Sequence, residues 1–572
     1  MAATIVSSAA VARLNATKRT GASVSSRVVA RCESLQIRRA SLESCRPLPP
    51  LEPASIAPPT DVSSPSFPFD LRGMTLRTDH AAPARLSRRA LVTRAVATPA
   101  PVTVPEPEQR EAITAPRPDV AMPNMQDPWN DPKWKDTKWT VYRDVAYNLQ
   151  PFYDKHPGGE WLLNLAIGRD CTALIESYHL RPEVSTARFS KLPVLEDFPV
   201  TAVPTSPRPN DSPLYNSIRT RVRKELFPRE GKAEHRMGGD AAAATIMGTA
   251  VACYALYANF TGPLAGAMLG LAGAWIGLTI QHCGNHGAMS PKTWVNNALG
   301  MTDDLIGGSS LMWRYHHQVS HHIHCNDNAL DQDVHTAMPL LRFDARQPKK
   351  WFHKFQHLYL FLAFPLMQVA FQVGDITGLI TKDCEGAKLH GATALELSTV
   401  VLGKIAHFGL LLGPALAHGW AAVGAGVAAF VAVQGMVLAS TFAVSHNVAE
   451  AKIPQDTGGE AWERDWGVQQ LVTSADWGGK VGNFFTGGLN LQVEHHLFPA
   501  ICFVHYPAIA KIVKEEAAKF GVPYSSYRTL PGIFVEFMRF VKEMGTAEQI
   551  GNVSIDEVKH VNKKLCPIAA FN

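Results

Sequence analysis

The chain has 572 residues, is 46% hydrophobic and has a mean hydropathy of −0.05. This size and composition exclude both a single compact domain and a protein that lies wholly in a membrane. Residues 1–100 hold fourteen Lys and Arg against six Asp and Glu; since the net charge is +5, the remainder carries −3, and nothing indicates nucleic-acid binding. The nine cysteines show no C-x-x-C spacing, which favours reduced thiols over disulfides or a thiolate zinc site.

The leader has the composition of an organellar transit peptide. Residues 1–32 contain no acid and combine Ala, Ser, Thr and Val with scattered Arg and Lys, without the apolar core of a secretory signal. We predict a disordered transit peptide over 1–95, with cleavage between Ala30 and Ala97, and a Pro-rich linker over 96–125. The length and the Ser, Thr and Pro content favour a chloroplast over a mitochondrial destination. An endoplasmic reticulum membrane is the second choice, and a merely disordered tail is the plain alternative.

A histidine motif follows the linker. The run His156-Pro-Gly-Gly159 turns the chain sharply, so that an imidazole can point into a slot, and His179 follows 23 residues later. Apolar residues between the two histidines provide walls for a flat ligand: Leu162, Leu163, Ile167, Leu174 and Ile175.

This segment, predicted over 126–200, resembles the cytochrome b5 fold, a small α+β domain. The resemblance implies haem b with His156 and His179 as its two axial ligands. Because two imidazoles saturate the iron, such a haem carries electrons and performs no oxygen chemistry itself. The phrase that precedes the motif, Tyr147 to Phe152, departs from the usual b5 sequence but leaves both ligands intact. A surface turn with a chance histidine is the alternative.

After a linker over 201–236, an all-α membrane domain is predicted over 237–545, with a tail over 546–572. Four apolar runs are long enough to cross a bilayer, at about 241–260, 264–281, 395–416 and 421–444. They form two hairpins. The segment 355–373 is apolar but interrupted by Pro365, so we expect it to lie in the interface. Buried helices of a soluble protein are the alternative for each run.

The hairpins place the histidine-bearing loops on one side of the membrane. His282 follows the second run and His446 follows the fourth, while the basic stretches 219–236 and 342–354 belong to the same side. The positive-inside tendency then assigns the haem module, the histidines and a helical cap to the stromal or cytosolic face.

Three histidine clusters lie beside these runs. They are His282 with His286, His317 with His321 and His322, and His495 with His496. Residues four apart on a helix share a face, so each of the first two clusters can direct two imidazoles at one point. Imidazoles suit iron, copper or zinc, but a redox-silent zinc would have no use for an attached electron carrier. The sequence therefore predicts a redox-active metal centre at a membrane surface.

The three boxes, H-x-x-x-H, H-x-x-x-H-H and Q-x-x-H-H, resemble those of the membrane fatty acid desaturases over residues 126–545. Gln492 at the start of the third box, with a b5 domain ahead of it, is similar to the front-end subgroup. The resemblance implies a di-iron catalytic centre with ligands His282, His286, His317, His321, His322, His495 and His496, and His446 as an eighth. Gln492 coordinates weakly, binds through water or holds the surrounding shell, and the sequence does not choose among these.

Several neighbouring residues need separate weighing. His316 has Ser320 four residues on, which favours a supporting or surface position over ligation. Glu494 and Asp304 are candidates for orienting the ligands, because metal-bound imidazoles usually donate their second N–H to an acceptor. Cys283 stands where related first boxes often carry Asp, so that acceptor must lie elsewhere.

The resemblance implies a front-end acyl-lipid desaturase, which introduces a cis double bond into a lipid-linked polyunsaturated chain. The reaction consumes O2 and two further electrons, delivered by the fused haem domain at high effective concentration. The expected partners are a galactolipid or other glycerolipid and a reductase or ferredoxin that reduces the haem. A Δ4-like regiochemistry is expected first, then Δ5 or Δ6. The alternatives are a fatty-acyl or sphingolipid hydroxylase on the same scaffold and a membrane-tethered b5 electron carrier.

Overall fold

The computed structural model describes residues 128–229, 233–327, 330–384, 386–452 and 465–550. All of them belong to one compact unit, Pro105–Asn572. The predicted transit peptide, the linker over 96–125 and most of the predicted tail lie outside the described residues.

The haem module is a small α+β domain, as predicted. Strands β1 (Trp139–Tyr142) and β2 (Val145–Asn148) pair antiparallel through a turn in which Arg143 and Asp144 both have positive φ, as the two-residue hairpin requires. Short helices follow and surround the two histidines of the motif: η1 (Gln150–Lys155), α3 (Glu160–Leu163), η2 (Asn164–Ala166), α4 (Thr172–Tyr178) and α5 (Pro182–Phe189). A buried core of Tyr142, Leu149, Leu163, Ile167 and Phe189 holds them together.

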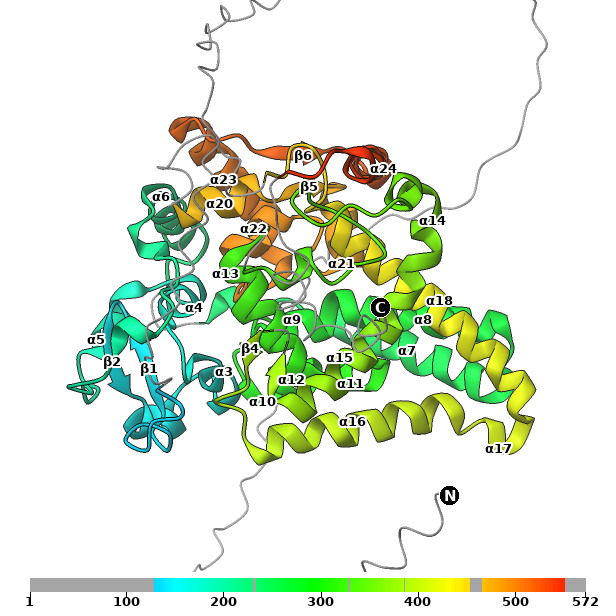
Figure 1. The fold of residues 1–572 in the computed structure, drawn as a ribbon, viewed down its shortest axis with the longest axis horizontal. Helices are drawn as coiled ribbons and strands as arrows, with labels where there is room; N and C mark the ends of the chain where they lie inside the picture. The colour runs from blue at the N-terminus through cyan, green and yellow to red at the C-terminus, as the bar shows by residue number, and fades with distance from the viewer. Residues whose placement is uncertain (1–127, 230–232, 328–329, 385, 453–464, 551–572) are drawn as a thin grey trace, which may run out of the picture. The chain divides into compact units, whose positions relative to one another are not determined.

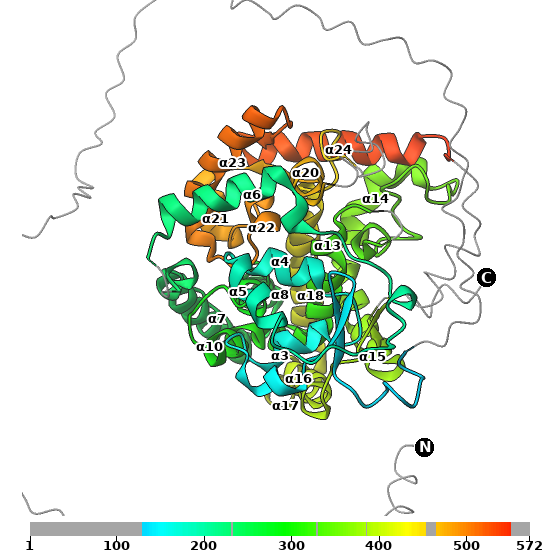
Figure 2. The same cartoon turned by 90° about the vertical axis from the view of Figure 1, so that its left-hand side faces the viewer.

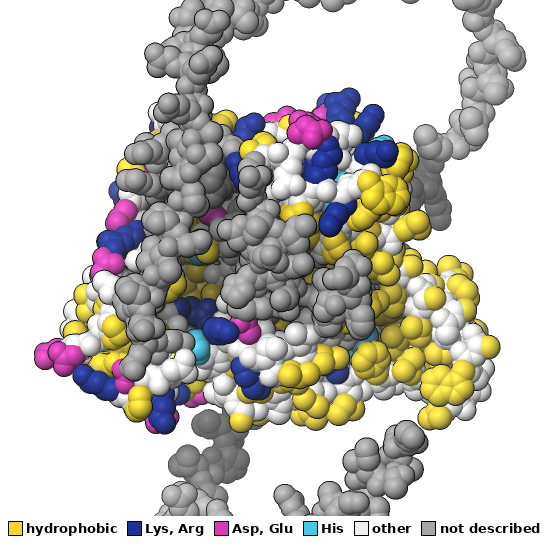
Figure 3. Space-filling view, in the orientation of Figure 1, with side chains coloured by type: hydrophobic (Ala, Val, Ile, Leu, Met, Phe, Trp, Pro, Cys, Tyr) yellow, Lys and Arg dark blue, Asp and Glu magenta, His cyan; other side chains and the backbone are white. Residues whose placement is uncertain are grey.

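The remaining described chain is mainly helical, and five of its helical segments are long and apolar enough to cross a membrane. Four coincide with the expected spans. They contain α7 (Asp240–Phe260), α8 (Pro263–Trp275) with η7 (Ile276–Gln281) and α9 (His282–Asn285), α16 (Ala394–Leu412) with α17 (Ala415–His418), and α18 (Trp420–Val444). Exposed apolar side chains cover this part of the surface, on the right of Figure 3.

The fifth segment, His353–Thr381, is the one expected to lie in the interface. Its length and composition suit a span, but a turn at Phe364–Leu366 with Pro365 breaks it into α14 (Gln356–Ala363) and α15 (Met367–Thr381). The Pro365 backbone packs directly against Gly435 of α18. That this segment does not cross the membrane therefore stays a prediction.

Glycines allow α8 and α18 to pack closely. A side chain at Gly266 would collide with the carbonyl oxygen of Gly426, and one at Gly270 with that of Phe430. A further one at Gly273 would collide with the Gln434 amide. Membrane helices associate through such small residues because lipid offers no hydrophobic drive between them. This contact holds the first hairpin against the second.

A helical cap covers the end of the bundle that carries the histidines, as expected (Figure 1). Its central contact is a parallel pair of strands, β5 (Ala475–Trp477) with β6 (Ser525–Tyr527). The cap helices are α6 (Pro213–Arg221), η5 (Val222–Leu226), α20 (Trp466–Val472), α21 (Gly479–Thr486), α22 (Gln492–Leu497), α23 (Tyr506–Phe520) and α24 (Leu530–Thr546). A large buried cluster that includes Tyr215, Trp466 and Phe498 joins α6, α20 and α22.

The connections between these parts are short elements. They are η3 (Val200–Ala202), η4 (Pro209–Asp211), η6 (Glu234–Arg236), α10 (Thr293–Gly300), α11 (Thr302–Ile306), α12 (Ser310–Trp313), η8 (Arg314–His321), α13 (His322–His324), η9 (Gln332–Val334), β3 (Asp383–Cys384) paired with β4 (Ala387–Lys388), η10 (His353–Phe355), η11 (Phe364–Leu366) and η13 (Phe503–His505).

The haem module is docked on the membrane domain by one buried and one exposed polar bond. The Asn164 amide donates to the Glu396 carboxylate at 2.7 Å, at the start of α16, and the Arg169 guanidinium donates to the Lys388 carbonyl at 2.5 Å. Arg314 lies 3.8 Å from Glu396, and its guanidinium stacks over the Trp161 ring of the module. Figure 2 shows the module side on, with α3, α4 and α5 in front of the bundle.

Candidate metal and haem centres

The three histidine boxes meet where the haem module, the bundle and the cap come together (Figure 1). The first box lies on α9, which continues the second span, the second on η8 and α13, and the third on α22 of the cap. Residues 282 and 496 are far apart in sequence, yet all the predicted ligands are buried and form one network of ring contacts.

One π-helical segment precedes the first box, and another carries most of the second. Ile276–Gln281 and Arg314–His321 are π-helical, with hydrogen bonds between residues five apart. In such a turn residues four and five apart share a face, which explains how His317, His321 and His322 all reach the centre. The expected α-helical geometry was wrong in this detail, although the shared face was anticipated.

The buried side chains form two four-membered groups that suit a metal ion. One group is His282, His286, His317 and His495, and the other is His321, Cys325, His446 and His496. Within each group the potential ligand atoms lie within 4.8 Å of one another. His322 lies between the groups, with its Nε2 3.0 Å from that of His317 and its ring stacked on that of His496. Two groups match a pair of metal ions better than a single ion.

Cys325 is the member that the sequence did not predict. Its thiol is buried, and its Sγ lies 3.5 Å from Nδ1 of His446. The sequence carried one signal for it, namely its position three residues after the second box, but a lone cysteine is a weak signal.

Most ligand candidates have one ring nitrogen held by a defined neighbour. Nδ1 of His286, His495 and His496 lies 2.6 Å from the Tyr178 hydroxyl, 3.4 Å from the Tyr506 hydroxyl and 2.9 Å from the Gln470 amide oxygen. Nδ1 of His321 lies 3.0 Å from Asp331 and 3.2 Å from Asp333. Such partners fix the orientation of a metal-binding imidazole.

The opposite nitrogens fit a metal. Nε2 of His286, His495 and His496 is buried and has no hydrogen-bond partner among the described residues. The same holds for Nδ1 of His282 and His322. Buried polar atoms are normally paired, so unpartnered nitrogens on five neighbouring rings fit coordination of metal ions by imidazole.

Burial keeps these rings neutral, as metal ligands must be. It lowers the pKa of His286, His317, His322, His495 and His496 well below the usual value, and that of His446 to about 4. Burial also lowers the pKa of His321, but the carboxylates of Asp331 and Asp333 outweigh it and raise the value. These two acids make His321 the most electron-rich imidazole of the set when it is deprotonated.

Gln492 lies against His446. Its amide nitrogen is 2.8 Å from Nε2 of His446, while Nδ1 of His446 is 3.1 Å from the Thr473 carbonyl. This contact brings Gln492 to the second metal group, beside the eighth predicted ligand. It does not choose between direct coordination and a supporting position.

Some expectations about the surrounding residues were wrong. Glu494 accepts from the Tyr524 hydroxyl at 3.0 Å, and Asp304 accepts from the Ser310 amide, so neither is the acceptor for a box histidine. Those acceptors are Asp331, Asp333 and Gln470, with Tyr178 and Tyr506 as hydroxyl partners. His316 binds Asp333 at 2.5 Å, which agrees with the supporting position expected for it.

The two motif histidines of the haem module face each other. Their ring centroids are 6.4 Å apart, a separation that admits one iron between two imidazoles. Nδ1 of His156 lies 3.1 Å from the Gly159 carbonyl and Nδ1 of His179 lies 2.7 Å from the Ile175 carbonyl, which leaves Nε2 of each ring for the iron. The residues therefore fit a haem with two histidine ligands.

An apolar cavity of about 760 Å³ lies between α7, α8, α18 and the cap. Leu278 and Thr441 line it, and they stand four and five residues before His282 and His446. Arg528 and Thr529 line it at the start of α24. The cavity is large enough for a flexible hydrocarbon chain.

Comparison with known proteins agrees with this arrangement. Residues 257–528 match the family model "Fatty acid desaturase", and residues 130–202 match the "Cytochrome b5-like Heme/Steroid binding domain". The chain is 59% identical over 475 residues to "Acyl-lipid (7-3)-desaturase, chloroplastic" of Chlamydomonas reinhardtii, covering 81% of this chain and 90% of that protein.

Two further relatives are more distant. "Acyl-lipid (7-3)-desaturase" of Rebecca salina is 32% identical over 427 residues, covering 71% of this chain and 90% of the relative. "Acyl-lipid (8-3)-desaturase" of Physcomitrium patens is 29% identical over 424 residues, covering 70% and 87%. The same order of domains is thus matched along most of each protein.

Proposed function

The chain belongs to the acyl-lipid fatty acid desaturases, and on that premise we propose which residues carry the reaction, which double bond it forms and where. It is an oxidoreductase of lipid-linked acyl chains with a fused cytochrome b5 domain, and its cofactors are haem and a di-iron centre. The roles of individual residues, the electron source and the regiochemistry are our proposals.

The proposed iron ligands are the seven histidines of the boxes, with His446 as the eighth and Gln492 beside it. One observation carries this assignment: seven of these eight histidines belong to two groups of four buried side chains, which Cys325 completes, and the ligand atoms of each group lie within 4.8 Å of one another. His322, the remaining histidine, lies between the two groups. When bound, a pair of irons supplies the activation of O2 that dehydrogenation of an unactivated methylene requires. The chain's part is to hold neutral imidazoles in fixed orientations, through Tyr178, Tyr506, Gln470 and Asp331.

His156 and His179 are the proposed axial ligands of the haem. A haem held by these residues would supply one-electron transfer, and a reductase or ferredoxin is its proposed reductant. The contact between Tyr178 and His286 supports the di-iron centre as the proposed acceptor, because it joins the segment of one haem ligand to a proposed iron ligand.

The cavity beside Leu278 is the proposed site of the acyl chain. Its walls are mainly apolar, and two of its lining residues, Leu278 and Thr441, stand four and five residues before His282 and His446. Apolar burial holds the chain and orients one pair of carbons at the irons, while the depth of the cavity sets the position of attack.

The proposed regiochemistry is the (7-3) activity printed in the names of two relatives, which is the Δ4-type reaction expected from the sequence. The proposed location is a chloroplast membrane, supported by the chloroplastic relative and by the composition of the leader. The acyl carrier is then a plastid glycerolipid, with a galactolipid as first choice.

Expression in a host that makes the polyunsaturated precursor, followed by lipid analysis that locates the new double bond, tests this proposal. Wild type is expected to form a cis double bond at position 4. His321→Ala and His496→Ala are expected to abolish it while the haem spectrum persists. His418→Ala is the matched control, since this exposed histidine bonds to the Ala258 carbonyl, away from the centre.

Each alternative predicts a different outcome. A hydroxylase would yield an alcohol in place of the alkene. A tethered electron carrier with structural histidines would leave lipid modification intact in both alanine variants. A new double bond at another position would contradict only the regiochemistry.

A further inference from the structure

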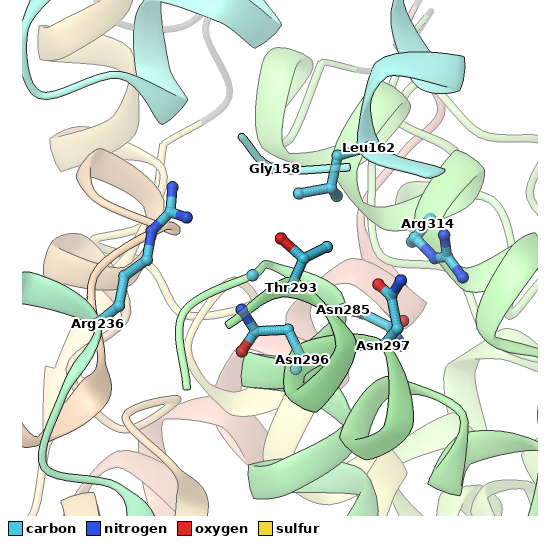
Figure 4. Close-up of a pocket in the computed structure, with 10 residues that line it drawn as sticks. Gly158, Leu162, Arg236, Asn285, Thr293, Asn296, Asn297 and Arg314 are labelled. Atoms are coloured by element: carbon cyan, nitrogen blue, oxygen red, sulfur yellow. The ribbon is translucent and has the colours of Figure 1, made fainter. Parts of the chain in front are cut away.

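Arg236 lies where the haem module meets the membrane domain. It ends η6 (Glu234–Arg236), shortly before α7 enters the bundle. Its side chain lines a narrow cavity whose other walls include Gly158 and Leu162 of the haem module and Thr293 of α10. Figure 4 shows Arg236 on one side of this cavity, across from Gly158 and Leu162. A residue outside the b5 domain therefore reaches the loop of the first axial ligand.

The charge of Arg236 has no partner among the described residues. Its Nε is buried without a hydrogen bond. The acid closest to it in sequence, Glu234, is already paired with Arg229 at 3.0 Å. Because an arginine carries its charge at every physiological pH, a partly buried guanidinium without a counterion is costly. The side chain is thus placed to receive an anion.

The cavity that Arg236 lines also reaches the first axial histidine. Gly158, which lines the same cavity, lies against the His156 ring, because a Cβ at Gly158 would be 2.8 Å from Cε1 of that ring. The guanidinium of Arg236 therefore shares a cavity with the loop that presents a proposed haem ligand.

The only anionic groups on a haem are its two propionates, which leave the ring at one edge. A guanidinium matches a carboxylate in charge and in planar, two-pronged geometry. We propose that Arg236 binds a haem propionate, so that the membrane domain completes the haem site and fixes the edge of the haem that faces the metal centre.

This inference rests on the proposed haem ligands, and its tests separate the two. His156→Ala is expected to remove the Soret band altogether. Arg236→Gln is expected to keep a two-histidine spectrum but to change the properties of the bound haem. If Arg236→Gln also loses the spectrum and Arg236→Lys keeps it, the positive charge at position 236 is needed to retain the haem.

The first experiment measures the haem midpoint potential in the detergent-solubilised full chain. Reduction adds a negative charge to the haem, so removal of a nearby cation favours the oxidised form. Arg236→Gln is expected to lower the equilibrium constant for haem reduction roughly tenfold, which is the scale of one charge-assisted hydrogen bond. For a one-electron couple, this corresponds to a midpoint potential lower by about 59 mV. Arg236→Lys should keep most of the potential, and Arg229→Gln, an exposed arginine of the same linker, should not change it.

The second experiment exchanges the cofactor instead of the residue, and so does not depend on how a variant folds. Wild type and Arg236→Gln are loaded with haem or haem dimethyl ester, and transfer of the haem to excess apomyoglobin is timed. Esterification is expected to speed loss from wild type roughly tenfold and to have little further effect in Arg236→Gln. Equal effects of esterification in both proteins, or an unchanged potential in Arg236→Gln, would overturn the proposal.

Discussion

The Tyr178 hydroxyl lies 2.6 Å from Nδ1 of His286 and joins the two cofactor sites by one hydrogen bond. Tyr178 is the last residue of α4 and immediately precedes the haem ligand His179, while His286 is a member of the first metal group. The bond therefore orients an iron ligand from the haem module. It also gives a covalent and hydrogen-bonded route between the two sites, from His179 through Tyr178 to His286.

Replacing Tyr178 by Phe removes this bond and retains the aromatic ring. Because this bond both orients an iron ligand and joins it to the haem module, we expect an unchanged haem spectrum and a roughly 10- to 100-fold slower reoxidation of the reduced haem, a larger effect than the loss of a ligand's partner alone causes in Tyr506→Phe. Stopped-flow absorbance after reduction of the full chain measures this rate. Tyr506→Phe is the control, since it removes a comparable hydroxyl from His495 without touching the haem module. Equal rates in both variants would refute a specific role for Tyr178.

The haem ligands should resist acid. Burial lowers the pKa of His179 to about 4, and that of His156 in the same direction, whereas an unfolded histidine titrates near 6.5. Between these values the unfolded chain binds more protons, so the stability of the module falls as the pH falls from about 6.5 towards 4. We expect the two-histidine Soret band to persist at pH 5 and to be lost near pH 4 in an absorbance titration. Loss that already begins above pH 6 would contradict this expectation.

Docking of the haem module depends on Glu396. Its carboxylate accepts from the Asn164 amide and from the backbone N–H of Thr393, the N-cap residue of α16. It also lies beside Arg314. Glu396→Ala removes the acceptor of the buried Asn164 N–H and the carboxylate beside the buried Arg314 guanidinium, so we expect a loss of about 3 kcal/mol in stability.

Thermal unfolding in detergent and amide hydrogen exchange across 160–170 and 388–396 measure this change. Glu396→Gln keeps the shape and an acceptor oxygen, so it should lose less than the alanine variant. Unaltered exchange in both segments of Glu396→Ala would show that other contacts hold the module.

The inner wall of the apolar cavity should control chain selection. Leu278 is buried, lines the cavity and lies four residues before His282. Leu278→Phe shortens the cavity. We therefore expect roughly 10-fold or greater discrimination against the longest acyl chain, which is about the selectivity that one or two methylene groups produce in an apolar pocket. Gas chromatography of lipids from cells fed chains of different length measures the product ratio. Val251→Phe, at an exposed site on α7, is the matched control.

The parts of the fold that repeat a local pattern could be predicted from the sequence. The His-Pro-Gly-Gly turn with His179, the four long apolar runs and the three boxes each depend on neighbours in the chain, and the α+β module and helical membrane domain are confirmed. The partners of the ligands were mostly missed because they come from distant segments without a periodic signal. Asp331, Gln470, Tyr178 and Tyr506 reach the centre only after the chain has folded.

The type of helix at the second box could not be predicted from the sequence. Spacing alone assigned the second box to an α-helix, whereas the chain there is π-helical. Over eight residues, hydrophobic periodicity does not distinguish a π-helix from an α-helix, and π-helical turns are often found at functional sites. Pro365 illustrates the opposite case, since the break between α14 and α15 follows directly from its missing N–H.

The buried bond between Asn164 and Glu396 has a kinetic consequence. One double bond requires two electrons, but a single haem delivers only one at a time. A module that had to move between its reductant and the di-iron centre would make this domain movement twice in every turnover. Because this bond holds the module on the membrane domain, we expect both electrons to be delivered without such a domain movement. Turnover should then depend on the concentration of the electron donor.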